Sequence, residues 1–164
     1  MEIRDMKPAD IGDVREVARQ TWSNTYKDVI PESVQRKFLD HAYSDTSLSR
    51  RMESGVFLVA AVDTKVLGFA NLNRLSRSEV FLGAFYVLPE AQGLGIGSRL
   101  LETGIGRFPS AERFVLRVAR ENTKARLFYK SRGFRETGEF EEALYGHKVH
   151  ETEMVLDANP RRGG

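Results

Sequence analysis

Apolar residues recur along the chain with two different periods, and each period predicts a type of secondary structure. From residue 11 to residue 22 they follow helical spacing after Asp10, which is suited to cap a helix: Ile11, Val14, Val17, Ala18 and Trp22. Pro31 suits the first turn of a second helix, whose apolar positions are Val34, Phe38, Leu39 and Ala42. A third, shorter helix is expected at about residues 46–53, and Ile3 is expected in a short strand before the first helix.

The middle of the chain favours strands. Residues 57–62 and 66–72 are strand-like runs joined by a short turn, which predicts a hairpin. Residues 80–87 are apolar on both faces, so this strand is expected to be central and buried. A helix at about 95–108, a strand at 113–119, a helix at 123–132 and strands at 134–141 and 149–156 follow. Without the third helix the order is β-α-α-β-β-β-α-β-α-β-β, which predicts an α/β fold, an α+β sandwich whose mixed central sheet is flanked by helices.

The length of 164 residues suits one domain, which we expect to span residues 1–158. The last six residues, 159–164, are rich in Pro, Arg and Gly and are expected to form a mobile tail.

Composition narrows the chemistry. The chain has no cysteine, which excludes a disulfide, a Cys-based zinc site and a thiol nucleophile, and no metal site is expected. Its 25 basic and 23 acidic residues nearly balance, so nucleic acid is not an expected partner. No apolar stretch approaches the ~20 residues that cross a bilayer, and the N-terminus lacks the features of a signal peptide. A cytoplasmic protein with no membrane partner is expected.

A glycine-rich turn, residues 92–97, lies between the strand at 80–87 and an amphipathic segment. The backbone N–H groups at a helix start have no partner within the helix, and the helix dipole adds positive potential there. The turn therefore predicts a phosphate-bearing ligand. Gly97 is followed by Ser98 and Arg99 rather than Lys-Ser/Thr, which argues against a Walker loop, and Ser98 occupies the place of the third glycine of a Rossmann fingerprint.

Two segments resemble the signatures of the GNAT superfamily of acyl-CoA-dependent N-acetyltransferases. Gln92, Gly95 and Gly97 match the pattern Q/R-x-x-G-x-G/A, and residues 122–134 resemble the second signature, an Asn followed by a helix that ends in Phe-Tyr and then Gly-Phe. The resemblance covers nearly the whole chain and implies the GNAT fold, with acetyl-CoA as the acyl donor and co-substrate. Residues 22–26, 30–33 and 145–147 are similar to the PaiA-like branch, which includes polyamine acetyltransferases.

The resemblance also implies roles for individual residues. Pantetheine would enter a gap beside the strand that ends at Val87 and pair with the backbone of Phe85, Tyr86 and Val87, and the N–H of Val87 would polarise the thioester carbonyl. Tyr129 would be the general acid that protonates the departing thiolate, although it is also a plausible core aromatic. Asn122 would hold pantetheine or orient its helix, and Phe128 would lie against the coenzyme. The diphosphate would be bound by the residues of the turn: Gln92, Gly93, Leu94, Gly95, Ile96, Gly97 and Ser98.

The general base and the acceptor site are less defined. The family commonly carries a Glu on the strand at 80–87, but here Phe81 and Gly83 occupy the expected places. Glu79 is a candidate base at the strand entrance, with an equally good interpretation as a solvated charge, and His147 and His150 are alternatives. Trp22, Tyr26 and His147 are expected to line the acceptor site. The carboxylates available to bind a polyamine are Asp28, Glu32, Glu79, Glu141 and Glu142.

These features predict an enzyme that moves an acetyl group from acetyl-CoA to a primary amine, a small amine or polyamine, by direct attack in a ternary complex. One alternative is a protein N-terminal or lysine acetyltransferase. Another is a CoA-binding regulatory module without catalysis, which the missing strand Glu favours. Homodimers are common among proteins that this chain resembles, so a homodimer is one expectation for its assembly.

Overall fold

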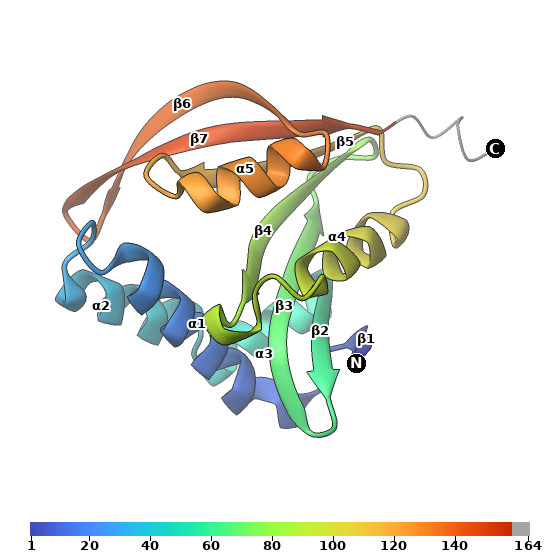
Figure 1. The fold of residues 1–164 in the computed structure, drawn as a ribbon, viewed down its shortest axis with the longest axis horizontal. Helices are drawn as coiled ribbons and strands as arrows, with labels where there is room; N and C mark the ends of the chain where they lie inside the picture. The colour runs from blue at the N-terminus through green and yellow to red at the C-terminus, as the bar shows by residue number, and fades with distance from the viewer. Residues whose placement is uncertain (159–164) are drawn as a thin grey trace.

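The computed structural model describes residues 1–158, so the expected mobile tail at 159–164 lies outside the described residues. A single seven-stranded sheet with strand order β1-β2-β3-β4-β5-β7-β6 runs through these residues (Figure 1). Only β4 and β5 pair in parallel. The strands are β1 (Glu2–Asp5), β2 (Val56–Val62), β3 (Lys65–Arg74), β4 (Glu79–Val87), β5 (Arg113–Ala119), β6 (Arg135–Leu144) and β7 (His147–Asp157). The mixed sheet expected from the sequence is confirmed.

Five α-helices accompany the sheet within residues 1–158: α1 (Ile11–Tyr26), α2 (Glu32–Ala42), α3 (Asp45–Ser54), α4 (Ile96–Gly106) and α5 (Thr123–Ser131). The short third helix is thus present as α3. One local prediction was wrong: the Asp10 side chain does not cap α1. It accepts hydrogen bonds from Arg4 and from the backbone N–H of Lys7, because the charged guanidinium of β1 is the stronger partner. No helix of residues 1–158 is both long and apolar enough to cross a membrane.

The helices cover opposite faces of the sheet. On β3, Leu72 lies against Gly104 of α4, while its neighbour Asn71 accepts a hydrogen bond from Arg51 of α3. Adjacent residues of a strand point to opposite faces, so α4 and α3 lie on different sides. Helices α1 and α2 share the α3 side, where Trp22 packs against Tyr86, and α5 shares the α4 side, where Phe128 and Tyr129 pack against Phe85.

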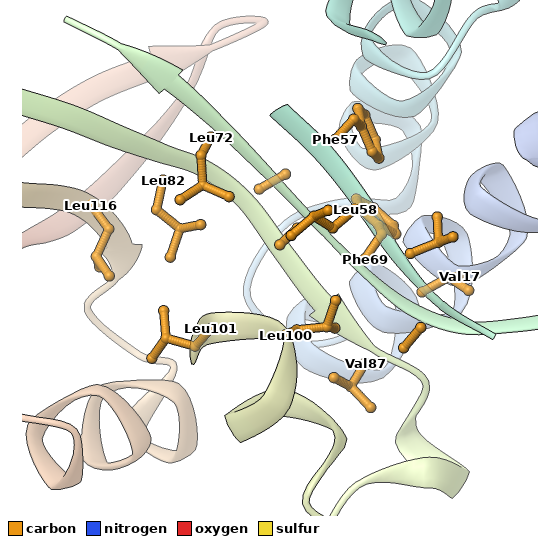
Figure 2. Packing of buried hydrophobic residues seen from close by; sticks show 14 of the residues in the cluster. Val17, Phe57, Leu58, Phe69, Leu72, Leu82, Val87, Leu100, Leu101 and Leu116 are labelled. Carbon is orange, nitrogen blue, oxygen red and sulfur yellow. The ribbon is translucent and has the colours of Figure 1, made fainter. Parts of the chain in front are cut away.

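The main core lies on both faces of the central strands (Figure 2). Leu58, Phe69, Leu72, Leu100 and Leu116 are at most 2% exposed. Removal of these side chains from water drives the helices onto the sheet, at about 25 cal/mol per Å² of apolar area. The strand predicted to be central, β4, is the fourth of seven and contributes Val80, Leu82 and Ala84 to this core.

The contact between β4 and β5 is short, and this positions the site. Three pairs join them: Glu79 with Arg113, Val80 with Phe114 and Phe81 with Val115. On its other side β4 stays paired with β3 as far as Val87, with a bulge at Gly83. β5 stays paired with β7 as far as Ala119. β4 and β5 therefore part after Phe81 and Val115 (Figure 1), and we call the space between their C-terminal halves the strand gap.

Candidate active site

The backbone of β4 presents unpaired donors to the strand gap. The N–H of Leu88 donates to the carbonyl of Leu67 at 2.8 Å, on the β3 side. Successive N–H groups of a strand point in opposite directions, so those of Phe85 and Val87 point away from β3 and toward the gap. The Val87 carbonyl accepts a hydrogen bond from Nε2 of Gln92 at 3.1 Å, which ties the start of the glycine-rich turn to the end of β4.

The glycine-rich turn has the backbone that an anion cradle requires. Gly93 and Gly95 both have φ of +82°, a region that only glycine enters at no steric cost. Gly95 caps α4, and the first helical bond runs from the N–H of Arg99 to its carbonyl. The N–H groups of the first three helical residues, 96–98, therefore have no acceptor within the helix. A Cβ added at Gly93 or Gly95 would meet nothing within 4 Å, so the surface beside the turn has room for a diphosphate.

Two basic side chains flank this turn. Lys124 bonds to the Gln92 side-chain carbonyl, and Arg132 bonds to the Ser98 hydroxyl while its guanidinium lies 5.4 Å from the centre of the Phe128 ring. Both come from the α5 segment. They add positive charge on either side of the free N–H groups, which favours an anionic ligand there.

Helix α5 carries the aromatic side chains beside the gap. Asn122 caps it, accepting a hydrogen bond from the N–H of Ala125 at 3.2 Å. The ring centres of Phe128 and Tyr129 lie 5.7 Å and 5.9 Å from that of Phe85 on β4. A Cβ added at Gly97 would come within 3.5 Å of Phe85 and Phe128, so the start of α4 packs closely on this aromatic group.

Tyr129 is 6% exposed. Burial raises the pKa of its phenol far above the usual value, and the nearby Tyr86 and Tyr26 raise it further. Tyr129 therefore stays protonated at neutral pH and keeps its hydroxyl proton. Tyr86 and Tyr26 belong to the α1 side of the sheet, whereas Tyr129 packs against Phe85 on the α4 side.

On the α1 side, a second group of aromatic residues faces the gap. Trp22 donates a hydrogen bond from Nε1 to the Tyr86 hydroxyl at 2.9 Å, and its ring meets that of Tyr26 edge-on at 4.7 Å. Burial is the main cause that raises the pKa of both Tyr26 and Tyr86. His147 lies 3.2 Å, through Nε2, from the Val29 carbonyl, and this contact brings the β6–β7 turn against the segment between α1 and α2. The three residues expected at the acceptor site thus come from segments that meet in space.

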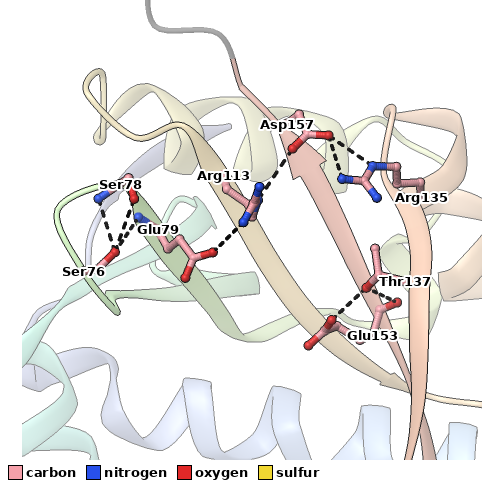
Figure 3. A network of polar contacts seen from close by, with 8 residues as sticks. All are labelled: Ser76, Ser78, Glu79, Arg113, Arg135, Thr137, Glu153 and Asp157. Atoms are coloured by element: carbon pink, nitrogen blue, oxygen red, sulfur yellow. Dashed lines mark hydrogen bonds and ion pairs between the residues drawn. The ribbon is translucent and has the colours of Figure 1, made fainter.

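Glu79 lies elsewhere. It is the first residue of β4, beside the paired part of β5, and its carboxylate binds Arg113 at 3.0 Å (Figure 3). Val87 is eight residues farther along the strand, about 26 Å at the usual rise per residue. The structure therefore does not bring Glu79 together with Tyr129. His150, the other alternative base, has its Nδ1 3.7 Å from the carboxylate of Glu141, which is exposed.

The carboxylates expected to bind an acceptor are mostly engaged by basic neighbours. Glu32 binds Arg36 at 2.8 Å, Glu141 lies 3.4 Å from Lys148, and Glu142 binds Arg117 at 2.9 Å. Sequence analysis missed Glu151 on β7, a half-buried carboxylate beside Glu142. Glu151 could have been found from the alternation along this strand, because residues 149, 151, 153 and 155 share one face and the two glutamates lie between two valines. Residues 1–158 contain no group of three side chains that would hold a metal ion.

The matches to this chain include an acetyltransferase family profile, two N-acetyltransferase relatives and a solved N-acetyltransferase structure. The profile of the acetyltransferase (GNAT) family matches residues 14–134. The chain is similar to spermidine N(1)-acetyltransferase of Thermoplasma acidophilum, with 29% identity over 143 residues, 82% of this chain and 88% of that protein. It is 32% identical over 106 residues to the uncharacterized N-acetyltransferase YuaI of Bacillus subtilis, and this match spans 62% of this chain and 61% of YuaI, less than two thirds of its length. The crystal structure of PaiA N-acetyltransferase from Thermoplasma acidophilum in complex with coenzyme A is similar with a TM-score of 0.81 and 25% identity, covering 96% of this chain and 98% of that one.

Proposed function

The chain belongs to the acetyltransferase (GNAT) family and is an acetyl-CoA-dependent N-acetyltransferase, and we propose that its acceptor is a small primary amine, preferably a polyamine. The observation that carries this proposal is the strand gap, with a turn suited to phosphate at one end and with phenols and a half-buried carboxylate beside it. Branch and acceptor are inferred from the PaiA-like relatives together with this arrangement.

On the donor side, we assign the diphosphate of acetyl-CoA to the N–H groups of residues 92–98, with Lys124 and Arg132 beside them. The backbone of residues 85–87 pairs with the pantetheine amides as an added strand would, using the donors that β5 leaves free. The N–H of Val87 stabilises the negative charge that develops on the thioester oxygen during attack. Asn122 orients α5, and Phe128 packs against the coenzyme.

Direct attack within a ternary complex suits the residues present. An alkylamine with a pKa near 10.4 is about 99.9% protonated at pH 7, so the site must remove one proton before the nitrogen attacks. Tyr129 supplies a proton to the departing thiolate, which is a weaker base than a phenolate but gains from immediate neutralisation. With no cysteine in the chain, an acyl-cysteine intermediate is excluded.

The preference for a polyamine follows from charge. A polyamine carries several ammonium groups, which carboxylates on the acceptor side would bind. Glu151 is half-buried beside Glu142, which Arg117 already engages, and Glu121 acts on the phenol of Tyr26 and raises its pKa. A peptide N-terminus offers a single ammonium group, so a carboxylate-bearing wall favours the polyamine over the protein acetyltransferase alternative.

A coupled assay of thiol release tests the proposal. Acetyl-CoA would be offered with spermidine, spermine, a monoamine of similar length, a peptide with a free N-terminus and a peptide with an internal lysine. We expect the highest kcat/KM with spermidine or spermine. Equal or faster release with either peptide would favour the protein acetyltransferase alternative. Acetyl-CoA binding with no release for any amine would identify a non-catalytic binding module.

A further inference from the structure

We propose that Glu151 is the general base, the carboxylate that accepts the proton of the acceptor's ammonium group before attack. This assignment rests on the proposed function, because it requires an amine acceptor. It fills a role for which the sequence offered only Glu79, His147 and His150. The structure places Glu79 at the other end of β4 and engages the two histidines with Val29 and Glu141.

The position of Glu151 follows from strand register. On β7 it lies opposite Ala119, the last residue of β5, and on its other side opposite Phe140 of β6. Ala119 carries only a methyl group, and Arg117, two residues earlier on the same face of β5, reaches over Phe140 to Glu142. Val149, two residues earlier on the same face, packs in the cluster that contains Trp22. Glu151 therefore belongs to the α1 face, from which the acceptor must approach.

The phenols of the site lie within electrostatic reach of Glu151. Burial is the main cause that raises the pKa of Tyr26 and of Tyr86, and the negative charge of Glu151 adds to the rise of each. Tyr86 and Tyr26 in turn influence Tyr129, on the other face of the sheet. Glu151 and Tyr129 thus lie on opposite sides of the strand gap. This arrangement suits a base that takes a proton from the amine nitrogen and an acid that gives one to the thiolate sulfur.

The surroundings of Glu151 make its carboxylate a stronger base than an exposed one. Burial raises its pKa, the adjacent Glu142 raises it further, and Arg117 lowers it. Arg117 is held by Glu142 at 2.9 Å and stacks over Phe140 at 3.9 Å, so it does not neutralise Glu151 completely. The charged groups that act on Glu151 are Glu142 of β6 and Arg117 of β5, and Glu151 in turn acts on Tyr86 of β4 and Tyr26 of α1. Glu153 is the next charged residue on the same face of β7.

The proton balance is complete. Glu151 takes one proton from the ammonium group, and the neutral nitrogen forms a bond to the thioester carbon. The carbon–sulfur bond then breaks, and Tyr129 gives its proton to the thiolate and regains one from the acylated nitrogen through water. Glu151 releases its proton to solvent. An ammonium group and a thioester yield an amide, a thiol and one proton, with no further reactant.

The test compares Glu151→Gln with wild type in thiol release from acetyl-CoA with spermidine across pH. Loss of general base catalysis typically costs 10²–10⁴-fold in rate, so we expect kcat to fall by ~100-fold or more at pH 7. Without a base, the reaction depends on amine that is already neutral, so the rate of Glu151→Gln should rise about tenfold per pH unit below the amine pKa. Acetyl-CoA affinity, measured by calorimetry, should match wild type.

Glu153→Gln is the matched control. Glu153 lies two residues away on the same face of β7 but binds Thr137 at 2.7 Å beside the paired part of the sheet (Figure 3). Its substitution should leave kcat and the pH profile unchanged. A loss as large as that of Glu151→Gln would mean that any charge removal on this strand disables the enzyme, and would overturn the assignment.

Two further variants keep the proposal falsifiable by moving the pKa of the base in opposite directions. Glu142→Gln removes a negative neighbour and lowers the pKa of Glu151, so the acid limb of the kcat/KM profile should shift to lower pH. Arg117→Gln removes a positive neighbour and should shift it to higher pH. Unshifted limbs in both variants, wild-type kcat in Glu151→Gln, or a raised KM with unchanged kcat would each overturn the role of Glu151 alone. Wild-type protein that acetylates no amine would overturn the proposed function and this role with it.

Discussion

The two ends of the β4–β5 contact differ in the burial and the pairing of their charged side chains. At the closed end, Glu79 pairs with Arg113 across adjacent strands, and Arg113 also lies 3.6 Å from Asp157 (Figure 3). These charges are open to solvent and compensate one another. At the open end, the strands part, Tyr129 is buried, Tyr86 and Tyr26 are partly buried, and Glu151 is half-buried beside another carboxylate.

The difference separates an exposed, paired carboxylate from a half-buried one, and only the second suits the proton transfer that we propose. An exposed ion pair contributes little to stability, and its carboxylate already has a cationic partner. A carboxylate desolvated beside a like charge is a stronger base. The same strand pair produces both environments because it stops pairing after three residue pairs.

The largest effect is expected at the open end from Tyr129→Phe. Removal of the phenol hydroxyl takes away the proposed proton donor, and kcat should fall by ~10²–10⁴-fold while acetyl-CoA affinity stays close to wild type. Steady-state kinetics and calorimetry measure the two quantities. Tyr145→Phe, at the exposed β6–β7 turn, is the control and should keep full activity. Wild-type kcat in Tyr129→Phe would remove Tyr129 from the mechanism.

An intermediate effect is expected from Gly95→Val in the glycine-rich turn. Valine at φ of +82° is strained, and its side chain would project into the space proposed for the diphosphate. We expect the Kd for CoA to rise about tenfold or more, since the turn of the free variant relaxes out of this conformation and restoring it on binding costs roughly 1–2 kcal/mol before any clash. Gly106→Val is matched, because its Cβ also meets nothing within 4 Å but its φ is not positive. Equal CoA affinity in the two variants would contradict the proposed cradle.

The smallest effect is expected from Glu79→Gln at the closed end. Because Glu79 lies far from the strand gap and its ion pair is exposed, kcat, KM and the thermal midpoint should all stay close to wild type. A large loss of kcat with normal thermal stability would indicate that Glu79 is the base and would contradict the difference proposed between the two ends.

The elements were predictable because each depends on local sequence periodicity. The apolar runs of β2–β4 and the helical spacing in α1 survive in the fold, and the strand at 113–119 has the predicted bounds. The positive φ of the glycine-rich turn was also predictable, since glycine at residues 93 and 95 favours that backbone conformation at those same residues. The failure of Asp10 to cap α1 was not predictable from the sequence. Arg4 takes its carboxylate, and the spacing of apolar residues near Asp10 does not show that β1 brings Arg4 to it.

By itself, the sequence determined the order of helices and strands, the positive φ of the glycine-rich turn and the resemblance that led to acetyl-CoA. Periodicity, positive φ and helix ends depend on neighbouring residues, so the local sequence is enough to predict them. The tertiary structure alone decided where β4 and β5 part, which phenols meet across that gap, and that Glu151 rather than Glu79 lies beside them. Strand register and burial depend on segments up to about a hundred residues apart, and it is burial that sets the basicity of a carboxylate.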